Sequence, residues 1–123
     1  MLLALAAIAK AAVDVLTHAE GANIFEQLGP WWDARTSWKR KYWDYDSGDL
    51  RPRFWGSKTV LVALTDFWHL TDFVYLSAYL VGALLLGAAL AGQPGWVWLV
   101  TAAGVKAGFG GVFEVFYRRV FRR

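Results

Sequence analysis

The hydrophobic pattern of this chain is dominated by one long apolar stretch in its second half. From Val60 to Ala91 the run exceeds the roughly 20 residues that an α-helix needs to cross a hydrocarbon core of about 30 Å. Three ionisable residues interrupt it near its start, namely Asp66, His69 and Asp72. The pattern predicts a membrane-spanning segment over residues 58–91 whose polar groups face protein or water.

The start of the chain carries a second helical pattern. Residues 1–18 are rich in Ala and Leu, and Lys10, Asp14 and His18 recur at four-residue intervals, which places them on one stripe of a helix. The segment is short for a membrane span. It predicts a first helix that either crosses the membrane or lies partly in its interface.

Two further segments complete the predicted elements. Residues 30–43 follow Gly29 and alternate Trp with Lys and Arg, which predicts an amphipathic helix in the headgroup layer. Residues 95–118 follow a Gly-Pro turn and predict another span, in which Gly104 and Gly108 allow a neighbouring helix to approach. The predicted fold is a single all-α membrane domain, residues 1–123, with about three transmembrane helices and one interfacial helix.

Composition and charge support a membrane location. Hydrophobic residues make up 57% of the 123 residues, and the 8 Trp suit an interfacial aromatic belt. Lys and Arg concentrate in residues 35–58 and 118–123, which predicts that both segments lie in the cytoplasm and that the protein resides in a bacterial inner membrane. This distribution sets membrane orientation and does not indicate nucleic-acid binding. The absence of Cys excludes disulfides and thiolate metal sites.

The three predicted spans contain ionisable residues, which are energetically costly to place inside a membrane. These residues fall at a similar depth in one leaflet. Asp14 and His18 lie at the inner end of the first helix, Asp66 and His69 a few turns in from the inner end of the second span, and Glu114 one turn in from the inner end of the third. Each ionisable group at membrane depth costs about 2.5–3.5 kcal/mol on insertion scales, so their coincidence suggests one shared polar site.

A metal site is one interpretation of this cluster. Two His and several carboxylates without Cys are ligands for Zn, Fe or Mn, and the candidate ligands and supporting groups are His18, His69, Asp66, Asp14, Asp72 and Glu114. In this hypothesis a metal-bound water attacks a lipid-type substrate, with Asp66 or Glu114 as general base. The basic residues Lys39, Arg40 and Lys41 then hold the lipid headgroup.

Other interpretations of the same residues remain open, and so does the question of enzymatic activity. The polar groups also suit a structural network that joins three helices, or a proton path. The chain as a whole fits a non-enzymatic accessory or oligomeric membrane subunit, or a holin-like pore protein, although the clustered His and Asp argue against a pore. The predicted partners are membrane lipids and either further copies of the chain or a larger membrane complex.

Several short motifs resemble a family of small bacterial integral membrane proteins of uncharacterised function. They are Asp14…His18, Ser37-Trp38-x-x-Lys41-Tyr42, Phe54-x-Gly56-Ser57-x-Thr59 and Leu64-Thr65-Asp66-x-Trp68-His69. The resemblance covers about the first 70 residues. It implies a membrane location and a shared structural plan, and it implies no activity.

Overall fold

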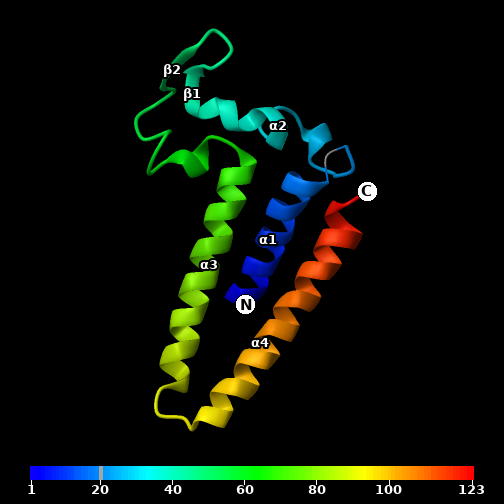
Figure 1. Ribbon diagram of the computed structural model, residues 1–123, viewed down its shortest axis with the longest axis vertical. Helices are drawn as coiled ribbons and strands as arrows, with labels where there is room; N and C mark the ends of the chain where they lie inside the picture. The colour runs from blue at the N-terminus through cyan, green and yellow to red at the C-terminus, as the bar shows by residue number, and fades with distance from the viewer. Residues whose placement is uncertain (20) are drawn as a thin grey trace.

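The computed structural model describes residues 1–19 and 21–123. Its two longest helices, α3 (Phe67–Leu90) and α4 (Gly95–Val115), form an antiparallel hairpin, and α1 (Leu2–His18) lies between them near one end (Figure 1). A π-helical segment, Phe116–Phe121, prolongs α4. The prediction of a mostly helical chain is confirmed.

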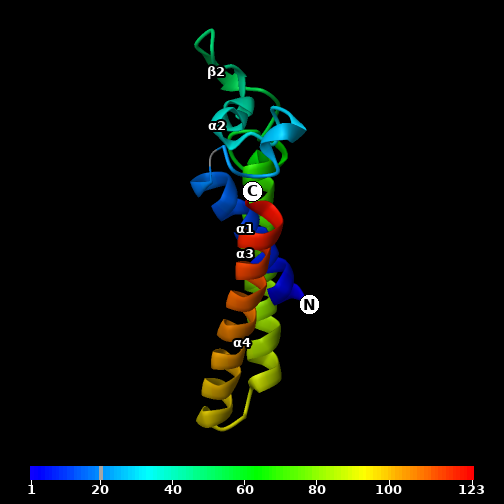
Figure 2. The same ribbon diagram turned by 90° about the vertical axis from the view of Figure 1, so that its right-hand side faces the viewer.

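Within residues 1–19 and 21–123, two helical segments, and not three, are long and apolar enough to cross a membrane. They are Phe67–Leu90, with a mean hydropathy of 2.1, and Gly95–Phe121, with a mean hydropathy of 1.4. The segment predicted as the first span, α1, has 17 residues. At 1.5 Å per residue it is only about 26 Å long, and its N-terminus lies part-way along α3 (Figure 2).

Small side chains explain how α1 fits between the other two helices. Its buried residues are mostly Ala, with Val and Leu near its end: Ala6, Ala7, Ala9, Ala11, Ala12, Val13, Val15 and Leu16. On α3, a Cβ atom added at Gly82 would lie 3.1 Å from Leu3 Cδ2, so the contact depends on glycine. The three helices thus form a wedge that α1 fills at one end only.

A small cap closes the end of the wedge where α1 ends. It contains a 3₁₀-helix at Glu26–Leu28, α2 (Ala34–Ser37), a 3₁₀-turn at Trp38–Lys41, and the antiparallel strands β1 (Tyr42–Asp44) and β2 (Asp49–Pro52). Of the helix predicted over residues 30–43, only residues 34–41 are helical, in two short pieces. Aromatic residues at 42 and 43 favour a strand, and Gly48 supplies the positive φ of +83° that the hairpin turn needs.

The predicted span over residues 58–91 also begins later than its apolar pattern suggests. Residues 57–66 form turns and a short 3₁₀-helix, Val62–Leu64, before α3 starts at Phe67. The reason is Asp66, whose carboxylate accepts the His69 backbone N–H at 3.1 Å and so acts as the N-cap of α3.

The C-terminal tail lies against the cap. The Ile24 N–H donates to the Phe121 carbonyl at 3.0 Å, and the Arg123 N–H donates to the Ala22 carbonyl at 2.7 Å. The ring of Phe25 packs between Phe67 and Phe121, with both centroids 5.0 Å away. We call this the capped end, and we call the opposite end, at the α3–α4 connection, the turn end (Figure 1).

Candidate functional site

A buried Asp–His pair begins α3 at the capped end. Asp66 has no exposed surface, and the side chain of His69 is 18% exposed. The Asp66 carboxylate is 2.6 Å from His69 Nδ1 and also accepts the Thr65 hydroxyl at 2.8 Å. An ionised carboxylate fixes the proton of a neutral imidazole on Nδ1. The lone pair of His69 Nε2 is then left for another partner.

Hydrogen bonding keeps Asp66 ionised. Burial by itself raises the pKa of this carboxyl, but the His69 ring, the His69 backbone N–H and the Thr65 hydroxyl all stabilise the carboxylate. Together they hold the pKa of Asp66 below its ordinary value. The pair therefore resembles the arrangement in many proton-transfer sites, where a carboxylate orients a histidine that acts as the base.

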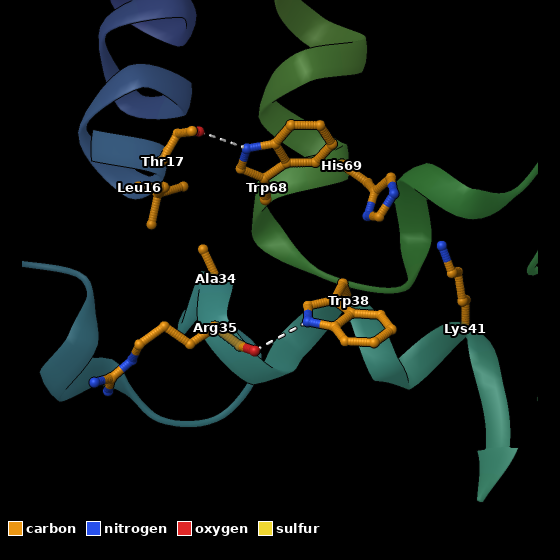
Figure 3. A pocket seen from close by; sticks show the side chains of 8 residues that line it. All are labelled: Leu16, Thr17, Ala34, Arg35, Trp38, Lys41, Trp68 and His69. Atoms are coloured by element: carbon orange, nitrogen blue, oxygen red, sulfur yellow. Dashed lines mark hydrogen bonds between the residues drawn. The ribbon is translucent and has the colours of Figure 1, made fainter. Parts of the chain in front are cut away.

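The His69 ring lines a pocket of about 430 Å³ between α1, α2 and the start of α3 (Figure 3). Its lining residues are Leu16, Thr17, Ala34, Arg35, Trp38, Lys41, Trp68 and His69. The amine of Lys41 points towards the His69 ring, whereas the Arg35 guanidinium points away from it (Figure 3). That guanidinium binds Asp33, with the two nearest pairs of atoms 3.0 and 3.3 Å apart.

The two indole rings of the pocket have their N–H groups engaged elsewhere. Trp68 Nε1 donates to the Thr17 hydroxyl at 3.0 Å, which ties α3 to α1, and Trp38 Nε1 donates to the Arg35 carbonyl at 2.9 Å. These two side chains therefore add apolar surface to the pocket. His69 and Lys41 lie together on one side of the pocket, away from Thr17 and Arg35 (Figure 3).

The cap fixes the backbone that carries Lys41. The Lys41 carbonyl accepts the buried Ser57 hydroxyl at 2.8 Å and the Arg53 N–H at 3.1 Å. One residue earlier, Arg40 Nε donates to the Thr65 carbonyl at 3.3 Å, beside Asp66. The cation of Lys41 lies 5.5 Å from the centre of the Tyr42 ring. These contacts tie the basic segment to the start of α3.

The basic residues predicted to hold a lipid headgroup have separate roles. Lys39 pairs with Asp46 at 2.5 Å, and Arg40 binds the Thr65 carbonyl. Only Lys41 lines the same pocket as His69.

The other predicted site residues lie apart from this pocket. Asp14 pairs with Lys10 one turn earlier on α1, and Glu114 pairs with Arg118 at 2.5 Å one turn later, with half of its side chain exposed. His18 is exposed at the end of α1. Asp72 lies one turn beyond His69 and has no hydrogen bond or ion pair within residues 1–19 and 21–123.

The predicted metal centre therefore has no assembled ligand group in the described part of the chain. Across residues 1–19 and 21–123, no three His, Asp or Glu side chains come close enough to share an ion. Only Asp66 and His69 of the candidate set meet, and catalytic zinc sites use three protein ligands. Asp66 acts here as the group that orients His69, because its carboxylate is enclosed. Zn, Fe or Mn binding stays a prediction.

Several residues of the pocket were not among the sequence-based candidates. Trp38, Trp68 and Thr17 line it, and Ser57 supports Lys41. Trp68 directly precedes His69 in the sequence, and this was a usable signal. Neighbouring residues at the start of a helix lie in the same layer of the structure. The Trp68–Thr17 contact joins residues far apart in sequence and had no local signal.

Comparison of the chain with protein-family models, with curated proteins and with solved structures finds no match. The resemblance to small bacterial membrane proteins thus stays a prediction, and the functional argument rests on the geometry above.

Proposed function

We propose that this chain is an integral membrane protein that binds the anionic headgroup of a lipid-type ligand in the pocket of His69 and Lys41, where His69 transfers a proton. The observation that carries this proposal is the Asp66–His69 pair, 2.6 Å apart, with Lys41 directed at the same pocket. Three lines of support follow, from helix exposure, pocket position and pocket chemistry.

Helix exposure favours the membrane. Of the most apolar window in Phe67–Leu90 only 11% is buried, and of that in Gly95–Phe121 none is. The core helix of a water-soluble protein would be mostly buried, and a signal sequence would lie at the N-terminus. The exposed side chains are large and apolar, among them Leu80, Leu84 and Leu99. Surfaces of this kind need lipid or protein around them.

The pocket lies where such a protein would meet the membrane boundary. Asp66 and His69 begin α3, and residues 35–58, just before them, contain seven of the 13 Lys and Arg residues. The C-terminal Arg residues lie at the same end (Figure 1). Basic residues at one end of a helical hairpin predict that this end faces the cytoplasm. Indole rings such as Trp38 and Trp68 are typical of the headgroup layer.

Pocket chemistry matches an amphipathic anion. Lys41 supplies a positive charge for a phosphate or carboxylate, while Leu16, Ala34 and the indole rings supply an apolar wall. With its proton on Nδ1, His69 accepts a proton at Nε2 from a water or hydroxyl group, and Asp66 stabilises the resulting imidazolium. The arrangement is suited to hydrolysis or group transfer at the headgroup of the bound lipid.

Lipid binding by matched variants tests this proposal. The purified chain is placed in nanodiscs of phosphatidylcholine, and binding of added phosphatidic acid is followed by native mass spectrometry. We expect Lys41→Met to weaken binding about tenfold, since it removes a charge-assisted contact of about 1.5–3 kcal/mol, and His69→Gln to abolish any turnover.

The controls are residues of the same type outside the pocket. Lys39→Met removes a cation that pairs with Asp46, and His18→Gln removes an exposed imidazole. Both should leave binding and turnover unchanged. Equal losses for Lys39→Met and Lys41→Met would show a general surface-charge effect and would overturn the assignment of the pocket.

A further inference from the structure

The turn end of the wedge contains a groove that α1 does not reach. It has a volume of about 760 Å³ and lies between α3 and α4, with Leu3 at its upper edge. Its walls include Tyr79, Gly87 and Leu90 from α3 and Ala102 and Lys106 from α4. Figure 1 shows the hairpin continuing well past the start of α1.

Lys106 is the unusual residue of this groove. No other Lys or Arg occurs between Lys58 and Arg118. Within residues 1–19 and 21–123 it has no hydrogen bond or ion pair. It lies about 16 Å along α4 from Gly95, at 1.5 Å per residue, which is the middle of a bilayer about 30 Å thick. A cation at that depth is costly unless it pairs with an anionic or polar group or faces a water-filled cavity.

We propose that this groove is the docking site for a membrane helix of a partner protein that carries a carboxylate at the depth of Lys106. This inference rests on the membrane location proposed above, and it is independent of the headgroup pocket. Charge complementarity is the main argument. Lipid headgroups stay at the boundary of the bilayer, whereas a helix holds Asp or Glu at any depth along its length.

The walls of the groove suit a helix. Small residues recur on both sides, at Ala83 and Gly87 on α3 and at Ala102 and Gly110 on α4, with Lys106 midway between the last two. Small residues let helix backbones approach closely inside a membrane. The same wedge already holds one helix in this way, since α1 packs through Ala residues and carries its own Lys10–Asp14 ion pair.

A second copy of this chain does not supply the carboxylate. In a parallel copy, Asp72 would lie about 10 Å nearer the capped end than Lys106, by the rise of α3 and α4 from their shared turn. Glu114 lies about 12 Å along α4 from Lys106 and is paired with Arg118. An inverted copy would place the basic cap on the opposite side of the membrane, against the charge rule. The partner is therefore a different protein.

A designed peptide tests the proposal directly. The probe is a Leu/Ala transmembrane helix with a single central Asp, and energy transfer to the labelled full-length chain is measured in phosphatidylcholine vesicles. We expect the Asp peptide to bind at least tenfold more tightly than a peptide with Asn at the same place. Moving the Asp two turns towards one end should remove this advantage.

Variants of the chain give the decisive comparison. Lys106→Met should bind the Asp and Asn peptides equally, whereas Lys58→Met, a basic residue outside the groove, should behave like the wild type. Lys106→Glu should reject the Asp peptide and bind a matching peptide with a central Lys. This reversal separates charge pairing from a general loss of folding.

Four results would overturn the proposal. Equal binding of the Asp and Asn peptides to the wild type would show that charge does not direct docking. Displacement of the Asp peptide by oleate, with no such effect on Lys106→Met, would assign the groove to a free lipid anion. Failure of the chain to float with vesicles would remove the membrane location itself, together with this inference. A chain that inserts and binds phosphatidic acid yet ignores the peptide would contradict the docking site alone.

Discussion

The two ends of the wedge differ in the partners that their charged side chains have. At the capped end, the Asp66 carboxylate is fully buried and has the His69 ring, a backbone N–H and a hydroxyl as partners. At the turn end, Lys106 faces a groove without a hydrogen bond or ion pair from residues 1–19 and 21–123. The capped end therefore gives its buried carboxylate several partners, while the turn end leaves the Lys106 cation without one among the described residues.

Helix α1 is responsible for much of this difference. It fills the wedge at the capped end and brings Thr17 to the indole N–H of Trp68. It begins near Gly82 and so leaves the rest of α3 and α4 uncovered. The same two helices thus form a closed interface at one end and an open groove at the other.

Removing the central carboxylate of the capped end should have the largest effect. Asp66→Ala deletes an N-cap, which costs about 0.5–2 kcal/mol, and leaves buried donors without an acceptor, which adds about 1–3 kcal/mol. We expect the free energy of unfolding in mixed detergent to fall by about 3 kcal/mol. Asp33→Ala is the matched control, because Asp33 caps the short, more exposed helix α2 and accepts the Arg35 N–H. A similar loss for both variants would contradict the special position of Asp66.

Crowding the contact between α1 and α3 should have the next largest effect. Gly82→Leu places side-chain atoms against Leu3, and overpacking of this kind costs about 1–3 kcal/mol. We expect a loss of about 2 kcal/mol in the same unfolding assay. A Cβ atom added at Gly104 on α4 meets no heavy atom within 4 Å, so Gly104→Leu should be tolerated. Equal tolerance at both positions would show that α1 does not pack in the wedge.

The hydrogen bond between α1 and α3 provides a smaller test. Trp68→Phe keeps the aromatic surface but removes the donor to the Thr17 hydroxyl, which should cost about 1 kcal/mol. Trp98→Phe alters an indole in the open groove and should change the unfolding free energy little. A larger loss of unfolding free energy for Trp98→Phe than for Trp68→Phe would show that the turn end, and not the capped end, holds the fold together.

Acid should weaken the capped end in a defined direction. The folded-state pKa of Asp66 lies below its ordinary value of 3.8. Ionised Asp66 therefore stabilises the fold above that value, and the contribution is lost as the pH falls through the lowered pKa. Unfolding followed from pH 7 to pH 2.5 should show this loss in the wild type and a flatter profile in Asp66→Asn. Identical profiles would contradict the hydrogen-bond network around the carboxylate.

The sequence predicted those features that depend on local patterns. The long apolar runs predicted α3 and α4, and the predicted polar cluster included both Asp66 and His69. The shared cluster of five polar residues did not form, because Asp14 and Glu114 each found an opposite charge one turn away, in Lys10 and Arg118. A local ion pair needs no helix packing, so it competes well with a distant site.

The cap and the short first helix were harder to predict. An alternation of Trp with basic residues fits an interfacial helix, but Asp33, Tyr42 and Gly48 supply a cap, a strand residue and a turn instead. The depth at which α1 enters the wedge depends on Gly82 meeting Leu3, a contact between distant parts of the chain. Periodicity within one segment carries no information on such contacts.

The most direct test of the account is a measurement of which side of the membrane each end occupies. The chain has no Cys, so single cysteines are introduced by Ser47→Cys in the β-hairpin, Gln93→Cys at the turn end and Arg123→Cys in the tail. Each variant is labelled in sealed inner-membrane vesicles with a reagent that does not cross lipid. We predict that positions 47 and 123 are labelled from the cytoplasmic side and position 93 only from the opposite side. Labelling of all three positions from one side would contradict a hairpin that crosses the membrane.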